Sequence, residues 1–171
     1  MEKYLLVIDM QKDFVDGALG TKEAEAIVSA AAGKTAGFEG TVIFTQDTHS
    51  ADYLSTQEGK KLPVEHCILG TEGHKIIPEL REAAASSKVF CKGTFGSLEL
   101  MEYLASRKDE IESIEIIGLC TDICVVSNAL LLKAAMPEIP IIVDSKCCAG
   151  VTPKKHEAAL ETMRSCQIEV I

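Results

Sequence analysis

A cysteine follows an apolar stretch and a glycine-containing turn in residues 118–125, which read GLCTDICV. Residues 114–117 (IEII) are apolar except for Glu115, as in a buried strand, and the apolar-periodic segment from Asp122 onward is typical of a helix, so Cys124 is predicted to lie at a strand-to-helix junction. A thiol at a helix amino terminus meets free backbone N–H groups and the positive end of the dipole. These lower its pKa and supply donors for an oxyanion, so the segment predicts a cysteine hydrolase.

Chemically reactive side chains also follow three other predicted strands. Asp9 comes directly after the first strand, Asp47 and His49 after the second, and Lys92 after the third. Ligands of an open parallel sheet bind outside the carboxyl ends of its strands, so these groups are expected on one edge together with Cys124. Each group alone could be a structural ion pair or cap. Their common position favours a functional site.

Strand and helix signals alternate along the whole chain, which predicts a parallel sheet covered by helices. Residues 46–74 show neither the helical nor the strand spacing of apolar residues, which predicts a long loop. A loop this long in a compact domain is usually functional. The strand order is open, although a converging Asp9, Lys92 and Cys124 favour adjacency of the first, third and fourth strands. The six predicted strands are 4–8, 41–45, 88–91, 114–117, 139–143 and 167–171, and the helices are 22–36, 75–84, 97–107, 122–135 and 153–165, the last with Thr152 as N-cap.

Composition limits the partners that this chain can bind. Its 171 residues suit one domain, 1–171, with one core. A net charge of −9 without a cluster of Lys and Arg argues against a nucleic-acid or anionic-membrane surface. No apolar run approaches the roughly 20 residues of a membrane span, and the amino-terminal segment lacks the cleavage site of a signal peptide. We expect a cytoplasmic protein that acts on a small molecule, with a homo-oligomeric state left open.

The seven cysteines fit neither a disulfide framework nor a zinc knuckle. Their number is odd and no Cys-x-x-Cys pair occurs, so most are expected to be reduced. Cys91 and Cys166 fall where a strand and a late helix end, and both are expected to be buried as small apolar residues. For the adjacent Cys147 and Cys148 the sequence favours no role.

Five segments, in this order and at compatible spacing, resemble the motifs of the isochorismatase-like cysteine hydrolases, and within them the nicotinamidases. The resemblance implies a three-layer α/β/α fold and a catalytic triad, here Cys124, Asp9 and Lys92. It also implies a cis peptide bond at Leu119–Cys120, with the N–H groups of Cys120 and Cys124 forming an oxyanion hole. The segments are 8–14 (IDMQKDF), 45–49 (TQDTH), 66–73 (HCILGTEG), 92–94 (KGT) and 118–125 (GLCTDICV).

The chemistry of such a triad follows from its groups. Amide hydrolysis needs a thiolate to attack, an acid to protonate the departing ammonia and donors for the tetrahedral oxyanion. Asp9 can take the thiol proton and return it to nitrogen, while Lys92 favours the thiolate and holds the carboxylate. No histidine is needed as the base. His74 and His156 lie outside the roles described, and we expect both to face solvent.

Asp47 and His49 are two residues apart, which places their side chains on one side of an extended segment. With His66 they offer two imidazoles and a carboxylate, a set that suits one divalent metal, zinc first, with iron or manganese as alternatives. Glu58 resembles the fourth ligand of some family members; the other interpretation is an exposed loop carboxylate.

A flat heteroaromatic substrate would need apolar or aromatic walls, for which Phe14 and Tyr53 are the candidates. The chain departs from the nicotinamidase pattern here. Residues 62–66 read LPVEH, without the aromatic residue that often precedes the metal histidine, and Thr48 stands where an aromatic residue is common. One wall of the pocket is therefore unassigned, which affects the identity of the substrate more than the chemistry.

Three functions remain open. The residues favour a metal-dependent nicotinamidase, which converts nicotinamide to nicotinate and ammonia. The second is another amidohydrolase of the family, acting on a ureido or linear amide, although a substrate without a ring nitrogen has less need of a metal. The third is a redox-sensing protein that uses Cys120 and Cys124, which would leave Asp9 and Lys92 unexplained. An isochorismatase proper is disfavoured, because its vinyl-ether chemistry does not need this nucleophile or metal set.

Overall fold

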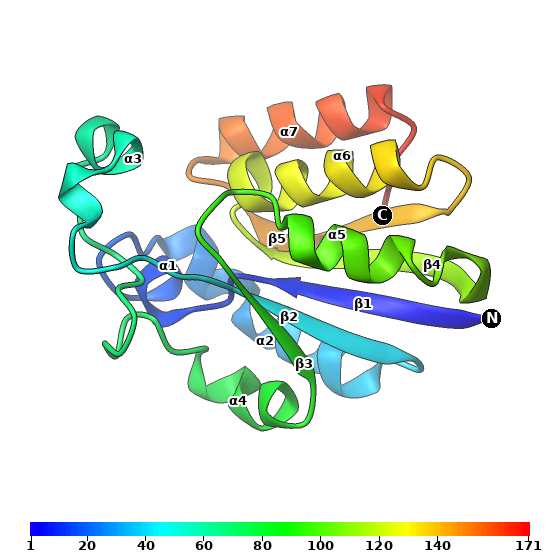
Figure 1. The fold of residues 1–171 in the computed structure, drawn as a ribbon, viewed down its shortest axis with the longest axis horizontal. Coiled ribbons are helices and arrows are strands. Elements are labelled where there is room, and N and C mark those ends of the chain that lie inside the picture. Colours follow the sequence, from blue (N-terminus) through cyan, green and yellow to red (C-terminus); the bar gives the residue numbers. More distant parts are fainter.

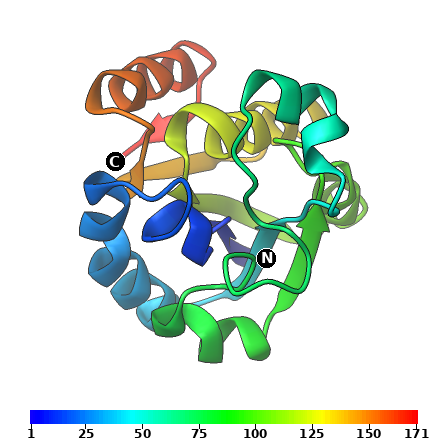
Figure 2. The ribbon, with the colours of Figure 1, turned by 90° about the vertical axis from the view of Figure 1, so that its left-hand side faces the viewer.

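The computed structural model describes residues 1–171 and contains one sheet of six strands, all of them parallel. Helices cover both faces of this sheet, which gives three layers, α/β/α (Figures 1 and 2). The predicted fold class and all six predicted strands are confirmed. In spatial order the strands are β3 (Lys88–Lys92), β2 (Thr41–Asp47), β1 (Glu2–Ile8), β4 (Ile111–Leu119), β5 (Ile141–Ala149) and β6 (Glu169–Val170).

Each face of the sheet has its own apolar core. The central strands β1 and β4 are apolar on both faces, as expected for strands that are covered twice. Leu6 and Ile116 belong to the core on one face, and Leu5 and Ile117 to the core on the other. The first core is covered by α5 (Leu98–Ala105), α6 (Val126–Ala135) and α7 (Pro153–Ser165), the second by α2 (Lys22–Gly37) and α4 (Pro78–Ala85).

The helices begin where their caps allow. Thr152 caps α7 as predicted, because its hydroxyl accepts from the Lys155 N–H and Pro153 occupies the first turn. The fourth helix starts at Pro78, later than predicted, since proline is favoured in a first turn and disfavoured in a helix interior. The long loop contains a 3₁₀ turn, Tyr53–Ser55, and a short helix, α3 (Gln57–Lys61), and a further short helix, α1 (Lys12–Val15), follows β1.

The end of one strand and the burial of two cysteines need correction. β5 runs on to Ala149, well past the predicted end at residue 143, because Cys148 and Ala149 pair with Gly118 and Leu119 of β4. Cys91 and Cys166 are exposed, whereas burial was expected. Cys91 lies on edge strand β3 and alternates with the buried Phe90 and Lys92, while Cys166 follows the last residue of α7.

Gly118, at the carboxyl edge of the sheet, allows the backbones of β1 and β4 to approach each other closely. Gly118 has a φ of 117°, and a Cβ at this position would collide with the carbonyl oxygen of Ile8, its partner in the β1–β4 register. The backbone of β4 is therefore free to turn toward Cys120 directly beside the end of β1. No helix of the protein has the length and apolar character needed to cross a membrane.

Candidate active site

Asp9, Lys92 and Cys124 meet at the carboxyl edge of the sheet, although they come from three separate elements. The Lys92 Nζ lies 2.6 Å from the Asp9 Oδ2 and 3.3 Å from the Cys124 Sγ. All three residues are buried. The lysine therefore touches both the carboxylate and the thiol, which is the arrangement expected of a triad.

The strand order differs from the adjacency that this convergence favoured. β1 and β4 are neighbours, but β2 lies between β1 and β3. Lys92 ends β3 directly beside Asp47 of β2 and spans the intervening strand with its four-carbon stem. A shorter side chain at this position would not reach Asp9.

Asp9 is held by Thr45, a residue that sequence analysis did not single out. The Thr45 hydroxyl donates to the Asp9 Oδ1 at 2.6 Å, and the Asp9 N–H donates to the same hydroxyl oxygen at 3.2 Å. Asp9 itself has a φ of 45°, a conformation that is uncommon outside glycine and is found at functional sites. Its Oδ2 has the Lys92 ion pair and no hydrogen-bond partner, so this oxygen has a lone pair free to take a proton.

The pKa of Cys124 is raised, whereas the position at a helix terminus was expected to lower it. Burial of the thiol raises its pKa well above the ordinary value, and the charge of Asp9 raises it further, while Lys92 opposes this only in part. Burial also raises the pKa of Asp9. Burial disfavours the charge on Lys92, but the Asp9 carboxylate and the neighbouring groups outweigh it and raise the lysine pKa. The resting site therefore holds a neutral thiol beside an ion pair, and the attacking thiolate must be generated by proton transfer.

Cys124 lies in a π-helical turn, Thr121–Val125, and not in the first turn of an α-helix as predicted. The carbonyl oxygen of Cys120 accepts from the N–H groups of both Ile123 and Val125, at 3.0 and 3.1 Å. The regular helix α6 begins only at Val126. Such turns are rare and recur at functional sites. The peptide bond Leu119–Cys120 is cis, as the resemblance implied.

Asp47, His49 and His66 form a group that could hold a divalent metal, since their potential ligand atoms all lie within 4.8 Å of one another. The Asp47 Oδ2 is 2.9 Å from the His49 Nε2 and 3.6 Å from the His66 Nε2. Glu58 of α3 approaches the same point, with its Oε1 3.7 Å from both imidazole nitrogens. The four donors converge and match a two-imidazole, two-carboxylate metal site.

The surroundings orient these ligands. The His66 Nδ1 donates to the carbonyl oxygen of Val64 at 2.8 Å, which turns the Nε2 atom toward Asp47 and Glu58. Burial by itself would raise the pKa of Asp47, but the hydrogen bonds from His49 and His66 and the charge of Lys92 outweigh it and hold the pKa below its usual range. Asp47 therefore remains an anionic ligand.

Tyr53 was predicted to line the cavity, but it does not. It is fully buried, and its ring packs against His49 and His66 with centroid distances of 4.7 and 4.9 Å. Its hydroxyl donates to the carbonyl oxygen of Leu62, the residue after α3, at 2.9 Å. Tyr53 thus fixes the imidazoles and the end of α3. Sequence analysis places an aromatic residue in this loop but does not show which way its ring turns.

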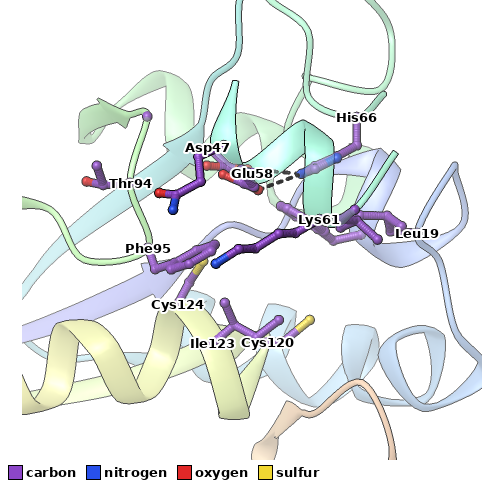
Figure 3. Close-up of a pocket in the computed structure, with 14 residues that line it drawn as sticks. Leu19, Asp47, Glu58, Lys61, His66, Thr94, Phe95, Cys120, Ile123 and Cys124 are labelled. Carbon is purple, nitrogen blue, oxygen red and sulfur yellow. Dashed lines mark ion pairs between the residues drawn. The ribbon is translucent and has the colours of Figure 1, made fainter. Parts of the chain in front are cut away.

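A cavity of about 400 Å³ opens over the thiol and the metal group. This volume suits a small organic ligand. Figure 3 shows Phe95 beside Cys124, with Glu58 and His66 farther along the wall. Phe14, placed here as predicted, packs against the His66 ring at 5.5 Å. The remaining lining residues are Leu19, Asp47, Gln57, Lys61, Leu62, Gly93, Thr94, Cys120 and Ile123.

Phe95 was not predicted from the sequence, because it lies in a glycine-rich loop without a periodic signal. A buried asparagine on α6, Asn128, holds this loop against the nucleophile turn. Its amide donates to the carbonyl oxygens of Cys124 and Phe95, at 2.8 and 3.2 Å, and its oxygen accepts from the Ser97 N–H at 2.9 Å. The backbone of Phe95 is therefore tied to the turn that carries the thiol.

The side-chain amide of Gln11 holds the end of β2, the strand that carries Asp47. Its Nε2 donates to the carbonyl oxygens of Asp47 and His74 at 2.8 Å each, and its Oε1 accepts from the Asp47 N–H at 2.7 Å.

The two histidines that were expected to face solvent, His74 and His156, instead contact other side chains. His74 is buried with its Nε2 2.8 Å from the Thr48 hydroxyl, and the half-buried His156 contacts the Thr121 hydroxyl at 2.7 Å.

A parallel α/β/α sandwich that gathers cysteine, aspartate and lysine at the carboxyl edge of its sheet is the arrangement of cysteine hydrolases built on an open sheet. Residues 3–171 match the family model of the isochorismatase domain, and the chain belongs to this family.

Similar proteins agree with that membership. The nicotinamidase/pyrazinamidase of Mycobacterium tuberculosis is 28% identical over 98% of this chain and 97% of its own length. Among solved structures, a nicotinamidase from Bacillus subtilis superposes with a TM-score of 0.85 at 27% identity, covering 99% of both chains. A pyrazinamidase of Pyrococcus horikoshii in complex with zinc gives the same TM-score at 25% identity, covering 100% of this chain and 99% of its own.

Proposed function

We propose that this protein is a nicotinamidase, which hydrolyses nicotinamide to nicotinate and ammonia, and that Cys124, Asp9 and Lys92 are its catalytic residues. The observation that carries the proposal is that one cavity is lined both by Cys124 and by Asp47 and His66 of the metal group. The names of the relatives, nicotinamidase and pyrazinamidase, support the same assignment.

The chain's own groups account for both half-reactions. The Cys124 thiol passes its proton to Asp9 while its sulfur bonds to the carboxamide carbon, and the proton then moves to the nitrogen, which leaves as ammonia. A water then attacks the thioester carbon and gives a proton to Asp9, and Asp9 returns this proton to the sulfur as the C–S bond breaks, which releases the acid and restores the thiol. Lys92 stays charged and balances whichever of Asp9 and Cys124 is anionic. We assign the oxyanion hole to the N–H groups of Cys120 and Cys124.

The walls of the cavity would hold a flat ring between the metal end and the thiol end of the cavity. Phe14 stands by the metal group and Phe95 by the thiol. Asp47, His49, His66 and Glu58 would hold the divalent metal, for which we propose zinc because two imidazoles with carboxylates suit it. When bound, the ion supplies a Lewis acid that can accept the lone pair of a pyridine nitrogen.

Ammonia release from a panel of amides tests this function. Nicotinamide and pyrazinamide both carry a ring nitrogen, and we expect both to be hydrolysed. Benzamide has the same shape without that nitrogen and should be poorer in kcat/KM by about a hundredfold or more, because a site built to bind a polar atom rejects an analogue that lacks it. Equal rates with benzamide, or a preference for a ureido compound, would replace the proposal by the other amidohydrolase function.

Metal content gives a second prediction that does not depend on turnover. The purified protein should carry close to one divalent ion per chain, and His66→Ala should lower the metal affinity by at least about tenfold to a hundredfold, because it removes a ligand. His156→Ala is the matched control, since this half-buried histidine lies outside the metal group and should keep the ion. Elemental analysis of both variants and of the wild type measures occupancy and identifies the metal. Full retention of the ion by His66→Ala would contradict the ligand assignment.

A further inference from the structure

Lys61 is a cation in the wall of the cavity that the proposed reaction does not use. It is the last residue of α3, three residues after Glu58. Figure 3 shows its side chain running across the cavity, with the amine directed toward Phe95 and Cys124 and away from His66. The preceding residue, Lys60, does not line the cavity.

The amine of Lys61 has no carboxylate partner. The other cavity carboxylates are engaged elsewhere, since Asp47 and Glu58 face the imidazoles. Lys92, the other lysine of the site, is neutralised by its ion pair with Asp9. Lys61 itself takes part in no ion pair within 4.0 Å. The thiol end of the cavity therefore carries a positive charge that the protein leaves uncompensated.

The segment that carries Lys61 is held firmly in place. The Leu62 N–H donates to the carbonyl oxygen of Glu58 at 2.8 Å, and the Leu62 carbonyl oxygen accepts from the buried Tyr53 hydroxyl. A side chain at Gly59 would collide with the backbone of Tyr53, so α3 packs tightly on this turn. The backbone that carries Lys61 is thus fixed at the wall of the cavity, and the solvent-exposed side chain extends from it.

We propose that Lys61 is a carboxylate-recognition residue, which binds the acid product of the reaction more tightly than the neutral amide substrate. This inference rests on the proposed function. The amide and the acid have nearly the same shape, but only the acid carries a negative charge at neutral pH, because carboxyl groups of this kind ionise near pH 4. A cation at the thiol end attracts the new carboxylate and leaves the carboxamide unaffected. The site is then built for inhibition by its own product.

The test compares the inhibition constant of nicotinate with the KM of nicotinamide in the full-length metal-loaded protein. In Lys61→Met, which removes the charge and keeps the length, the ratio of nicotinate Ki to nicotinamide KM should rise about tenfold, the size of one charge-assisted hydrogen bond. Lys61→Arg should keep the wild-type ratio. Lys60→Met is the matched control and should keep it too. Raising the salt concentration should weaken nicotinate inhibition of the wild type more than that of Lys61→Met.

An unchanged ratio of Ki to KM in Lys61→Met would overturn the inference in either of two forms. Unchanged values of both constants would mean that Lys61 does not contact the ligand, and a parallel rise of both would mean that Lys61 only packs against the ring. Either result leaves the proposed function standing as long as nicotinamide is hydrolysed. Absence of ammonia release from nicotinamide in the wild type would instead overturn the function. Calorimetric titration of nicotinate into the wild type and Lys61→Met measures the charge-dependent binding without turnover.

Discussion

Cys124→Ala is expected to abolish hydrolysis of nicotinamide while leaving a folded protein. The Sγ faces the cavity beside the Lys92 amine, and no other thiol reaches that point. Alanine suits the start of a helix, so only the attacking atom is removed, and the loss of one buried sulfur should lower the free energy of unfolding by about 1 to 2 kcal/mol. Ammonia release measures the activity, and thermal unfolding with circular dichroism verifies the fold.

Cys120→Ala serves as the internal control for this prediction. Cys120 also lines the cavity, but its proposed role belongs to its backbone N–H, which alanine retains. Burial raises the pKa of its thiol to about 12, and the Lys92 amine contacts the sulfur of Cys124 rather than this one. Its loss should cost less than about tenfold in turnover. Equal inactivation by the two substitutions would favour the redox function and contradict the assignment of Cys124 as the only nucleophile.

Asp9→Asn should reduce turnover by at least about a hundredfold, because it removes the group that carries the proton from the thiol to the leaving nitrogen. The rate of Cys124 alkylation at a given pH should instead rise in this variant. The Asp9 charge raises the thiol pKa, so its removal leaves Lys92 unopposed and shifts the thiolate population, and with it the alkylation rate, to lower pH. Rates of iodoacetamide labelling between pH 6 and 9, followed by peptide mass mapping of Cys124, measure this effect.

The same experiment separates two roles for the carboxylate. Loss of turnover without slower alkylation means that Asp9 delivers the proton to ammonia. If alkylation slows in parallel with turnover, the thiol ionises only when Asp9 takes its proton, and the electrostatic account, in which the Asp9 charge raises the pKa of Cys124, is wrong. Asp16→Asn is a suitable control, since this exposed carboxylate pairs only with Lys12 and should leave both rates unchanged.

The chemistry at the edge of the sheet can be predicted from residue types because it depends on strand ends. Asp9, Lys92 and the pair Asp47 and His49 each lie at the end of an apolar run, and in a parallel sheet all such runs end on the same edge. The alternation of strands and helices predicts the layers for the same local reason. Thr45 and Gln11 lie within the recognised segments, yet their support of Asp9 and Asp47 depends on side-chain directions that spacing does not encode.

Tertiary contacts decide what the sequence leaves open. The strand order places β2 between Asp9 and Lys92, and only the reach of the lysine restores the contact. The pKa of Cys124 depends on burial and on a carboxylate from 115 positions earlier in the chain, so a local helix-terminus argument predicts the wrong direction. The second aromatic wall, Phe95, reaches the cavity from a loop, and the unpaired Lys61 reaches it from the end of the short helix α3; neither segment has a periodic signal in the sequence. Periodicity reports which face of an element is buried, whereas loop side chains take their direction from contacts with distant segments, and these exist only once the sheet has formed.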